Sequence, residues 1–103
     1  MPFKLRFAPR ASATLNELKN GGPNEQAKLK KVNRALGRLE QNPRHPGLNS
    51  YPYPNFPGVS PDIQVWHSYV ENRTPSAWRI FWRYGPNEGG VPVITVLAIT
   101  PHT

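Results

Sequence analysis

The stretch that decides the fold is "AWRIFWRYG", residues 77–85, in which large apolar side chains alternate with arginines. In a β-strand, successive side chains point to opposite faces of the sheet. One face would then carry Trp78, Ile80, Trp82 and Tyr84, and the other would carry Ala77, Arg79, Phe81 and Arg83. The pattern predicts a strand with one face in the core and the other face open, basic and bearing one aromatic ring.

The composition of the 103-residue chain is that of a basic protein that fits one domain. Its net charge of +7 favours a polyanionic partner, nucleic acid before an acidic protein or a membrane surface. Because the chain has no cysteine and only three scattered histidines, we expect no metal site, no disulfide and no cofactor. It has neither a long apolar run nor a signal-peptide pattern, so we expect a cytoplasmic protein without a membrane partner.

The N-terminal part predicts a strand followed by a short helix. Residues 3–9, "FKLRFAP", alternate apolar and polar side chains, which is typical of a half-buried strand, and the proline ends it. Ser12 is expected to cap a helix over residues 13–20, which two glycines then terminate.

The longest predicted helix covers residues 24–41, "NEQAKLKKVNRALGRLEQ". Its apolar residues recur three or four positions apart and so share one face: Leu29, Val32, Leu36 and Leu39. Its basic residues cover much of the remaining surface: Lys28, Lys30, Lys31, Arg34 and Arg38. Such charges usually form only a solvated helix face. Because just two glutamates in this helix offset them, contact with an RNA backbone is the alternative.

The segment 42–62 is rich in Pro, Gly and Asn and predicts a long loop. Loops of this length in compact domains are either functional or disordered. Its rings, Tyr51, Tyr53 and Phe56, either pack against the domain or stack on a partner. Further strands are predicted over residues 64–72 and 91–101, joined to the 77–85 strand by turns.

These elements predict a single compact α+β domain over residues 1–103 with the order βααβββ. Packing two helices on one face of a twisted, mainly antiparallel four-stranded sheet buries both the Trp-rich strand face and the leucine stripe. Arg79, Phe81 and Arg83 then lie on the open face of that sheet.

This arrangement resembles the RelE/ParE superfamily, the RelE-like toxins of bacterial type II toxin–antitoxin systems in particular. The resemblance covers nearly the whole chain and rests on features in a fixed order: a first strand ending in "FAPRA", two helices, the phrase "LGRLEQNPRHPG", the strand "WRIFWRYG" and a last strand running into "ITVLAITPH". Two departures are that the strand over residues 64–72 has no Lys or Arg and that the insertion over residues 48–62 is longer than the usual link.

The resemblance implies a toxin with a cognate antitoxin protein as its partner. RelE-like members enter the ribosomal decoding site and cleave mRNA, whereas ParE-like members inhibit DNA gyrase, and the fold alone does not choose between them. We predict an mRNA interferase, a ribosome-dependent endoribonuclease that inhibits translation by cleaving mRNA without metal through the substrate 2′-hydroxyl. The alternatives are a non-catalytic gyrase inhibitor and a basic RNA-binding module without chemistry.

Metal-free RNA cleavage needs a charged donor at the phosphate and a group that moves protons. Arg79 is predicted for the phosphate, because it lies on the open face and matches the family's arginine on that strand. Arg83, further along the same face, is expected at the same or the next phosphate. The resemblance implies a proton-transfer role for His102, just after the last strand. His67 and Glu71, on one side of the preceding strand, are a secondary acid–base pair.

The remaining predicted contacts with RNA are aromatic or basic. Phe81 and Tyr84 are expected to stack on bases, although Tyr84 closing the core is the alternative. The other predicted RNA-binding residues are Arg73, Lys28, Lys30, Lys31, Arg34, Arg38, Arg44 and His45.

Overall fold

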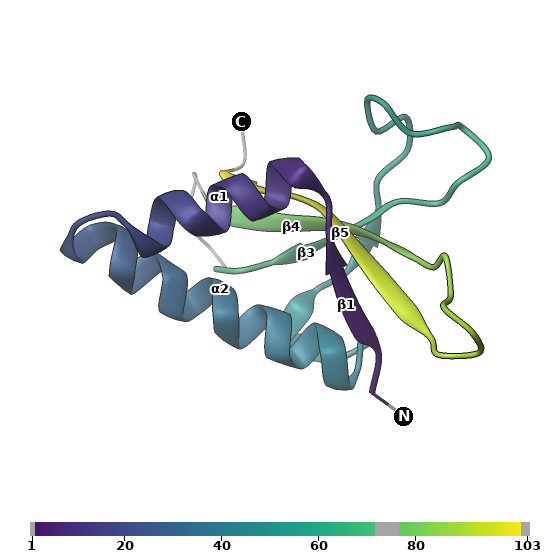
Figure 1. Cartoon of the computed structure of the whole chain (residues 1–103), viewed down its shortest axis with the longest axis horizontal. Helices are drawn as coiled ribbons and strands as arrows, with labels where there is room; N and C mark the ends of the chain where they lie inside the picture. Colours follow the sequence, from purple (N-terminus) through teal and green to yellow (C-terminus); the bar gives the residue numbers. More distant parts are fainter. Residues whose placement is uncertain (1, 72–76, 102–103) are drawn as a thin grey trace.

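The chain begins with one strand, continues through a helical hairpin and ends in consecutive strands of one sheet (Figure 1). The structure is a computed structural model that describes residues 2–71 and 77–101. The helices are α1 (Pro9–Lys19), α2 (Pro23–Gln41) and the short 3-10 helix η1 (Pro46–Leu48), and the strands are β1 (Lys4–Phe7), β2 (Tyr51–Pro52), β3 (Trp66–Tyr69), β4 (Trp78–Tyr84) and β5 (Val93–Pro101).

The sheet has five strands in the order β1-β5-β4-β3-β2. Strand β1 runs parallel to β5, and the other neighbours are antiparallel. The prediction of four strands in the order βααβββ is therefore wrong, because β2 lies within the segment predicted as a loop. Tyr51 and Pro52 pair with His67 and Trp66 at the edge of the sheet, where a proline is tolerated because it need not donate to a further strand.

The helices form close to where the sequence predicts them. The prediction that Ser12 caps the first helix is wrong, because the N-cap is Ala8 and Pro9 opens the helix. Proline suits that position, since its missing N–H would have no partner in the first turn. The prediction for the long helix is confirmed, and its start is fixed by Glu25, whose carboxylate accepts the Gly22 N–H at 2.8 Å.

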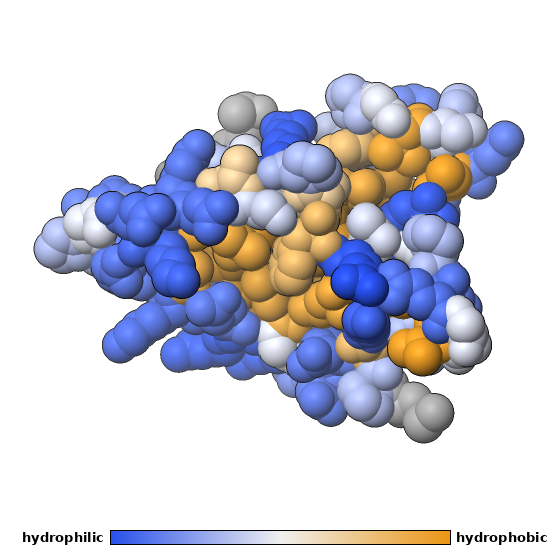
Figure 2. All heavy atoms as spheres, in the orientation of Figure 1, coloured by the Kyte–Doolittle hydropathy of each residue, from blue (hydrophilic) through white to orange (hydrophobic). Residues whose placement is uncertain are grey.

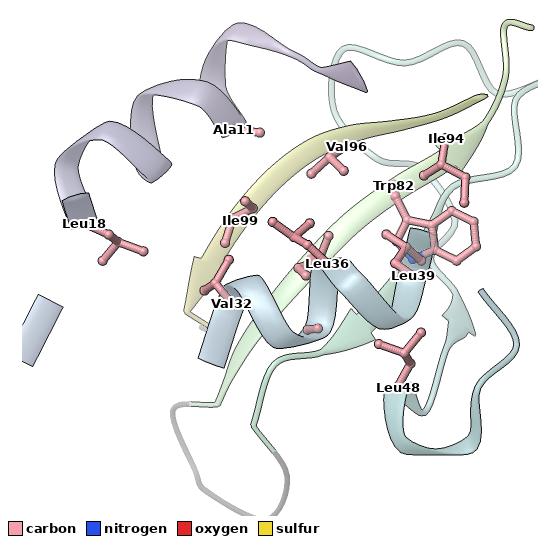
Figure 3. Packing of buried hydrophobic residues seen from close by; sticks show 12 residues of the cluster. Ala11, Leu18, Val32, Leu36, Leu39, Leu48, Trp82, Ile94, Val96 and Ile99 are labelled. Carbon is pink, nitrogen blue, oxygen red and sulfur yellow. The ribbon is translucent and has the colours of Figure 1, made fainter. Parts of the chain in front are cut away.

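The two helices cover one face of the sheet and bury the main core there (Figure 3). Val32, Leu36 and Leu39 of α2 belong to the same buried cluster as Ile80 and Trp82 of β4, as the alternation in β4 predicts. Figure 2 shows hydrophobic residues gathered between the helices and β1, with hydrophilic residues over the outer surfaces of the helices. The amphipathic pattern of α2 thus determines which face of the sheet it covers.

A chain of hydrogen bonds crosses this core. The indole Nε1–H of Trp82 donates to the Ser68 hydroxyl at 2.7 Å, and the hydroxyls of Ser68 and Ser50 lie 2.7 Å apart. The Ser50 hydroxyl donates to the Pro43 carbonyl at 3.3 Å. The central strands are thereby joined to the segment that follows α2, and the buried indole N–H is satisfied.

The opposite face of the sheet is partly covered, so the prediction of an open face is wrong around Phe81. The Phe81 side chain is only 9% exposed, and a second apolar cluster forms on it with Val65 and Ala98. The rings of Tyr53 and Phe56 lie 4.9 and 5.3 Å from the Phe81 ring. Residues 53–65 fold back over this face because they carry apolar rings that Phe81 can bury.

The strand predicted over residues 64–72 is shorter, since β3 ends at Tyr69. The turn predicted between β3 and β4 lies outside the residues that the structure describes.

Candidate functional site

Arg79 is the centre of a cluster of side chains on the loop-covered face. It pairs with Tyr69 in the antiparallel register of β3 and β4. One guanidinium nitrogen, Nη1, donates to His67 Nδ1 at 3.1 Å, and the other, Nη2, donates to the Tyr69 hydroxyl at 3.0 Å. The guanidinium carbon also lies 4.5 Å from the centre of the Tyr69 ring. Two side chains of β3 thus orient the arginine through hydrogen bonds and a cation–π contact.

The charge of Arg79 has no acidic counterpart in the part of the chain that the structure describes. None of the ion pairs among residues 2–71 and 77–101 includes Arg79, and its buried Nε–H has no hydrogen-bond acceptor there. Buried donors are usually paired, and an exception calls for an explanation. The partners of the guanidinium, a neutral imidazole nitrogen and a phenol, leave its positive charge available to an anion.

His67 serves to orient Arg79. The imidazole is only 8% exposed and stacks on Phe81, with ring centres 5.8 Å apart and an angle of 12°. Tyr53 meets it edge-on at 5.4 Å. Because a guanidinium only donates hydrogen bonds, Nδ1 of His67 must carry a lone pair, which places the proton on Nε2. Nδ1 is therefore occupied by Arg79 and is not available to take up a proton from substrate.

Glu71 lies with α2 and not with His67. Its carboxylate accepts from Lys28 Nζ and, at 3.2 Å, from Lys31 Nζ. The hydrogen bond from Lys28 is the main reason why the pKa of Glu71 is lowered. The predicted His67–Glu71 pair is not formed, because strand geometry ends at Tyr69 and the alternation does not extend to Glu71. Lys28 also lies over the Trp78 ring, 5.4 Å from its centre.

Arg83 and Tyr84 lie at the far end of β4. Between them and Arg79 the register with β5 shifts, because Leu97 of β5 has no partner between Phe81 and Trp82. The Arg83 Nε–H donates to the Tyr84 carbonyl at 3.1 Å, so the structure does not bring Arg83 into the cluster of Arg79. The Tyr84 ring lies 5.0 Å from that of Trp82 at the core and Tyr84 is 42% exposed, so its stacking on a base stays a prediction. Burial raises the pKa of the Tyr84 phenol.

Arg44 and His45 line a cavity of about 610 Å³ between η1 and the sheet. The aromatic residues that line it are Tyr51, Trp66, Trp82 and Tyr84. The predicted basic extension at the end of α2 thus forms a pocket with aromatic walls, and the pocket involves no residue of the Arg79 cluster.

The other predicted RNA contacts divide into three groups. Lys30, Arg34 and Arg38 are exposed on the outer surface of α2. Lys28 and Lys31 are engaged with Glu71, as described above. Arg73 and His102 lie outside the described residues.

The sequence prediction missed Tyr69 as a partner of Arg79 and left open whether Tyr53 packs against the domain or stacks on a partner. Tyr69 shares a face with His67 by simple alternation, but only the register of β3 against β4 places it opposite Arg79. Tyr53 carries no periodic signal, since it follows a two-residue strand.

Among residues 2–71 and 77–101, no group of three His, Cys, Asp or Glu side chains is placed to hold a metal ion. No helix in the same part of the chain is long and apolar enough to cross a membrane.

Comparison with known proteins identifies the fold. No protein-family model matches the sequence, and a search of curated proteins gave no significant match. Among solved structures, one shares the two-helix, mixed-sheet fold of this chain over its full length. That structure is the YoeB dimer from Staphylococcus aureus, with a TM-score of 0.63, 14% sequence identity and coverage of 100% of both chains. At this identity, the likeness establishes a shared fold over the full length of both chains.

Proposed function

We propose that the chain is a toxin of a type II toxin–antitoxin system and acts as a ribosome-dependent mRNA endonuclease. YoeB is a RelE-family toxin, so the full-length likeness in fold agrees with the sequence resemblance to the RelE/ParE superfamily. The proposal includes a cognate antitoxin, the ribosome and mRNA as partners, the cytoplasm as location and one toxin domain over residues 1–103.

The observation that carries the proposal is the environment of Arg79. Its guanidinium is half-buried and held by neutral groups, and its Nε–H has no acceptor among the described residues. Removing a charge from water without a counter-charge lowers stability. Such an arrangement is useful where an anion supplies the missing charge, as a phosphate of RNA would. If this face were only exposed to solvent, a half-buried cation without a counter-charge among the described residues would bring the protein no advantage.

The proposed reaction is attack by the 2′-hydroxyl oxygen on the adjacent phosphorus. The bond from phosphorus to the 5′ oxygen of the next nucleotide breaks, which leaves a 2′,3′-cyclic phosphate on one fragment and a 5′-hydroxyl on the other. The proton lost from the 2′-hydroxyl balances the proton gained by the leaving oxygen. Arg79 stabilises the additional negative charge on the phosphate, and His67 and Tyr69 hold it in place before the substrate arrives.

Proton transfer is assigned to His102, on the resemblance alone. Tyr69 is a second candidate, because its hydroxyl oxygen accepts from Arg79 and a phenol that accepts a hydrogen bond still carries a proton that it can donate. Phosphate contact by Arg83, base stacking by the exposed Tyr84 and ribosomal RNA contact by the exposed cations of α2 are parts of the same proposal, whereas base stacking by Phe81 is dropped because its ring is covered.

The test is to incubate the purified protein with programmed bacterial ribosomes and to map the mRNA ends. We expect cuts within the codon in the decoding site. In Arg79→Ala the cleavage rate should fall about 10²–10³-fold, the usual cost of losing one oriented donor to the developing charge. The matched control is Arg10→Ala, which removes an exposed arginine of α1 and should cleave like wild type.

Intact mRNA with a folded wild-type protein that still inhibits bacterial growth would overturn the nuclease proposal in favour of gyrase inhibition. Intact mRNA without growth inhibition would favour an RNA-binding module.

A further inference from the structure

The cavity beside η1 is a second binding site, apart from Arg79. We propose that it binds a nucleotide, with the base against the aromatic walls and the phosphate at Arg44. The inference deepens the proposed function and rests on it, because an RNA strand held at Arg79 is one source of that nucleotide; a free nucleotide is the other.

The walls suit a flat aromatic ligand. The cavity volume of about 610 Å³ is within the usual range for small-molecule sites. Trp66 and Trp82 are stacked, with ring centres 6.0 Å apart and an angle of 17°, and Tyr84 meets Trp82 at 83°. Tyr51 and Tyr84 are 57% and 42% exposed, so their rings offer surface that the core does not use. Exposed rings of this kind are platforms on which bases stack.

The polar lining is basic. Arg44 and His45 line the cavity, and no carboxylate of residues 2–71 or 77–101 does. Arg44 is exposed, and none of the ion pairs in the described part of the chain includes it. His45 Nδ1 accepts the Gly47 N–H at 2.9 Å, so in the neutral ring the proton is on Nε2, which is a donor. Aromatic walls beside two cationic or donating groups match a ligand that is both aromatic and anionic.

The cavity is held in shape by the core. Leu48 of η1 is fully buried, and the chain of hydrogen bonds from Trp82 through Ser68 and Ser50 reaches Pro43 on the cavity wall. A site formed before the ligand arrives loses less entropy on binding.

Tyr51 connects the cavity to the Arg79 cluster. It lines the cavity, and its ring centre is 6.3 Å from that of His67, which holds Arg79. Tyr51 belongs to β2, the edge strand, where no further strand blocks the passage of an extended ligand. An RNA strand with one phosphate at Arg79 can therefore pass this edge and place a neighbouring nucleotide in the cavity.

The experiment is an NMR titration of the full chain that follows the indole N–H signals of its tryptophans. The probes are AMP, adenosine, ribose 5-phosphate and a short single-stranded oligoadenylate. We expect AMP and the oligonucleotide to shift the Trp66 signal and to leave that of Trp78, which lies under Lys28, unchanged. Adenosine and ribose 5-phosphate, which each lack one half of the ligand, should bind at least about tenfold more weakly than AMP.

The variants separate the two halves of the site. Arg44→Ala should weaken AMP binding about tenfold by loss of a charged phosphate contact, and Arg10→Ala, the matched removal of an exposed arginine, should not change it. Tyr84→Leu should weaken AMP and adenosine alike by loss of a stacking face. At least about tenfold tighter binding of oligoadenylate than of AMP would assign the site to an RNA strand, and equal binding would assign it to a free nucleotide.

The inference is overturned if neither AMP nor the oligonucleotide moves the Trp66 signal, or if Arg44→Ala binds AMP like wild type. A shift caused by an acidic peptide alone would overturn it in favour of a protein partner. Its failure is distinct from that of the proposed function: the Arg79→Ala protein should bind AMP like wild type. Cleavage by wild type without nucleotide binding rejects the inference alone, whereas nucleotide binding without cleavage rejects the nuclease proposal alone.

Discussion

The two faces of β4 differ in how their side chains are buried and paired, although the residues concerned are neighbours in the sequence. On the helix-covered face, Ile80 and Trp82 are almost fully buried and the indole N–H is satisfied by Ser68. On the loop-covered face, Arg79 is half-buried with neutral partners and no counter-charge among the described residues. The helix-covered face therefore contributes to stability, whereas the loop-covered face retains a cation that lowers stability. Substitutions on the two faces should therefore change the free energy of unfolding by different amounts.

Ile80→Ala should have the largest effect on stability. Ile80 is fully buried in the main core, so truncation leaves a cavity and should lower the free energy of unfolding by about 2–5 kcal/mol. Urea denaturation followed by circular dichroism measures the loss. The control is Val91→Ala, an exposed apolar position, which should change stability little. Equal losses in the two variants would contradict the account of the core.

Ser68→Ala should lower the free energy of unfolding by about 1–3 kcal/mol, because it leaves the buried Trp82 N–H without an acceptor. Ser60→Ala, at an exposed serine with one long hydrogen bond of 3.4 Å, is the control. Thermal denaturation of both variants checks the difference. A Ser68→Ala protein as stable as wild type would show that the chain of hydrogen bonds is not a structural link.

Glu71→Gln should lower stability by about 1–2 kcal/mol at neutral pH, because Lys28 and Lys31 lose a partly buried charged acceptor. The pKa of Glu71 is lowered in the folded chain, so its contribution is present above the ordinary value of 4.5 and is lost as the pH falls through the folded pKa. Melting temperatures from pH 7 down to pH 3 should therefore fall less steeply for Glu71→Gln than for wild type. Melting temperatures that fall equally steeply with pH in both proteins would contradict the role of Glu71.

Glu88→Gln should have the smallest effect, since the carboxylate lies outside both faces and pairs with exposed Arg6 and Lys4. The hydrogen bond from Arg6 lowers the pKa of Glu88 to about 2. Its contribution is thus fully present above pH 4.5 and is lost between pH 4.5 and about 2. A small drop in melting temperature at neutral pH that disappears toward pH 2 is the expected result, and a drop as large as that of Glu71→Gln would contradict it.

The sequence predicted the fold where side-chain periodicity is long. Alternation over residues 77–85 and the leucine spacing of α2 were sufficient to assign the core face of the sheet and the helix that covers it. Strand β2 could not be predicted, because two residues, one of them a proline, have no periodicity and become a strand only by pairing with β3. The cover over Phe81 was equally unpredictable, since it depends on where residues 53–65 turn back in space.

The candidate site was predicted in part. Arg79 follows from alternation within one strand, but its partners His67 and Tyr69 depend on the register between two strands, which local sequence does not encode. The prediction for Glu71 failed because it extended strand periodicity past the end of β3.

The most direct test of the central claim is the free energy of unfolding of Arg79→Met, measured by urea denaturation beside wild type. Methionine keeps the apolar stem of the side chain and removes a charge that has no counter-charge among residues 2–71 and 77–101. The account predicts a stability within about 1 kcal/mol of wild type, because the loss of the hydrogen bonds to His67 and Tyr69 is offset by the removal of a half-buried charge from a site without a counter-charge. A loss as large as that of the neighbouring Ile80→Ala variant would contradict it, because Arg79 would then be part of the structural core.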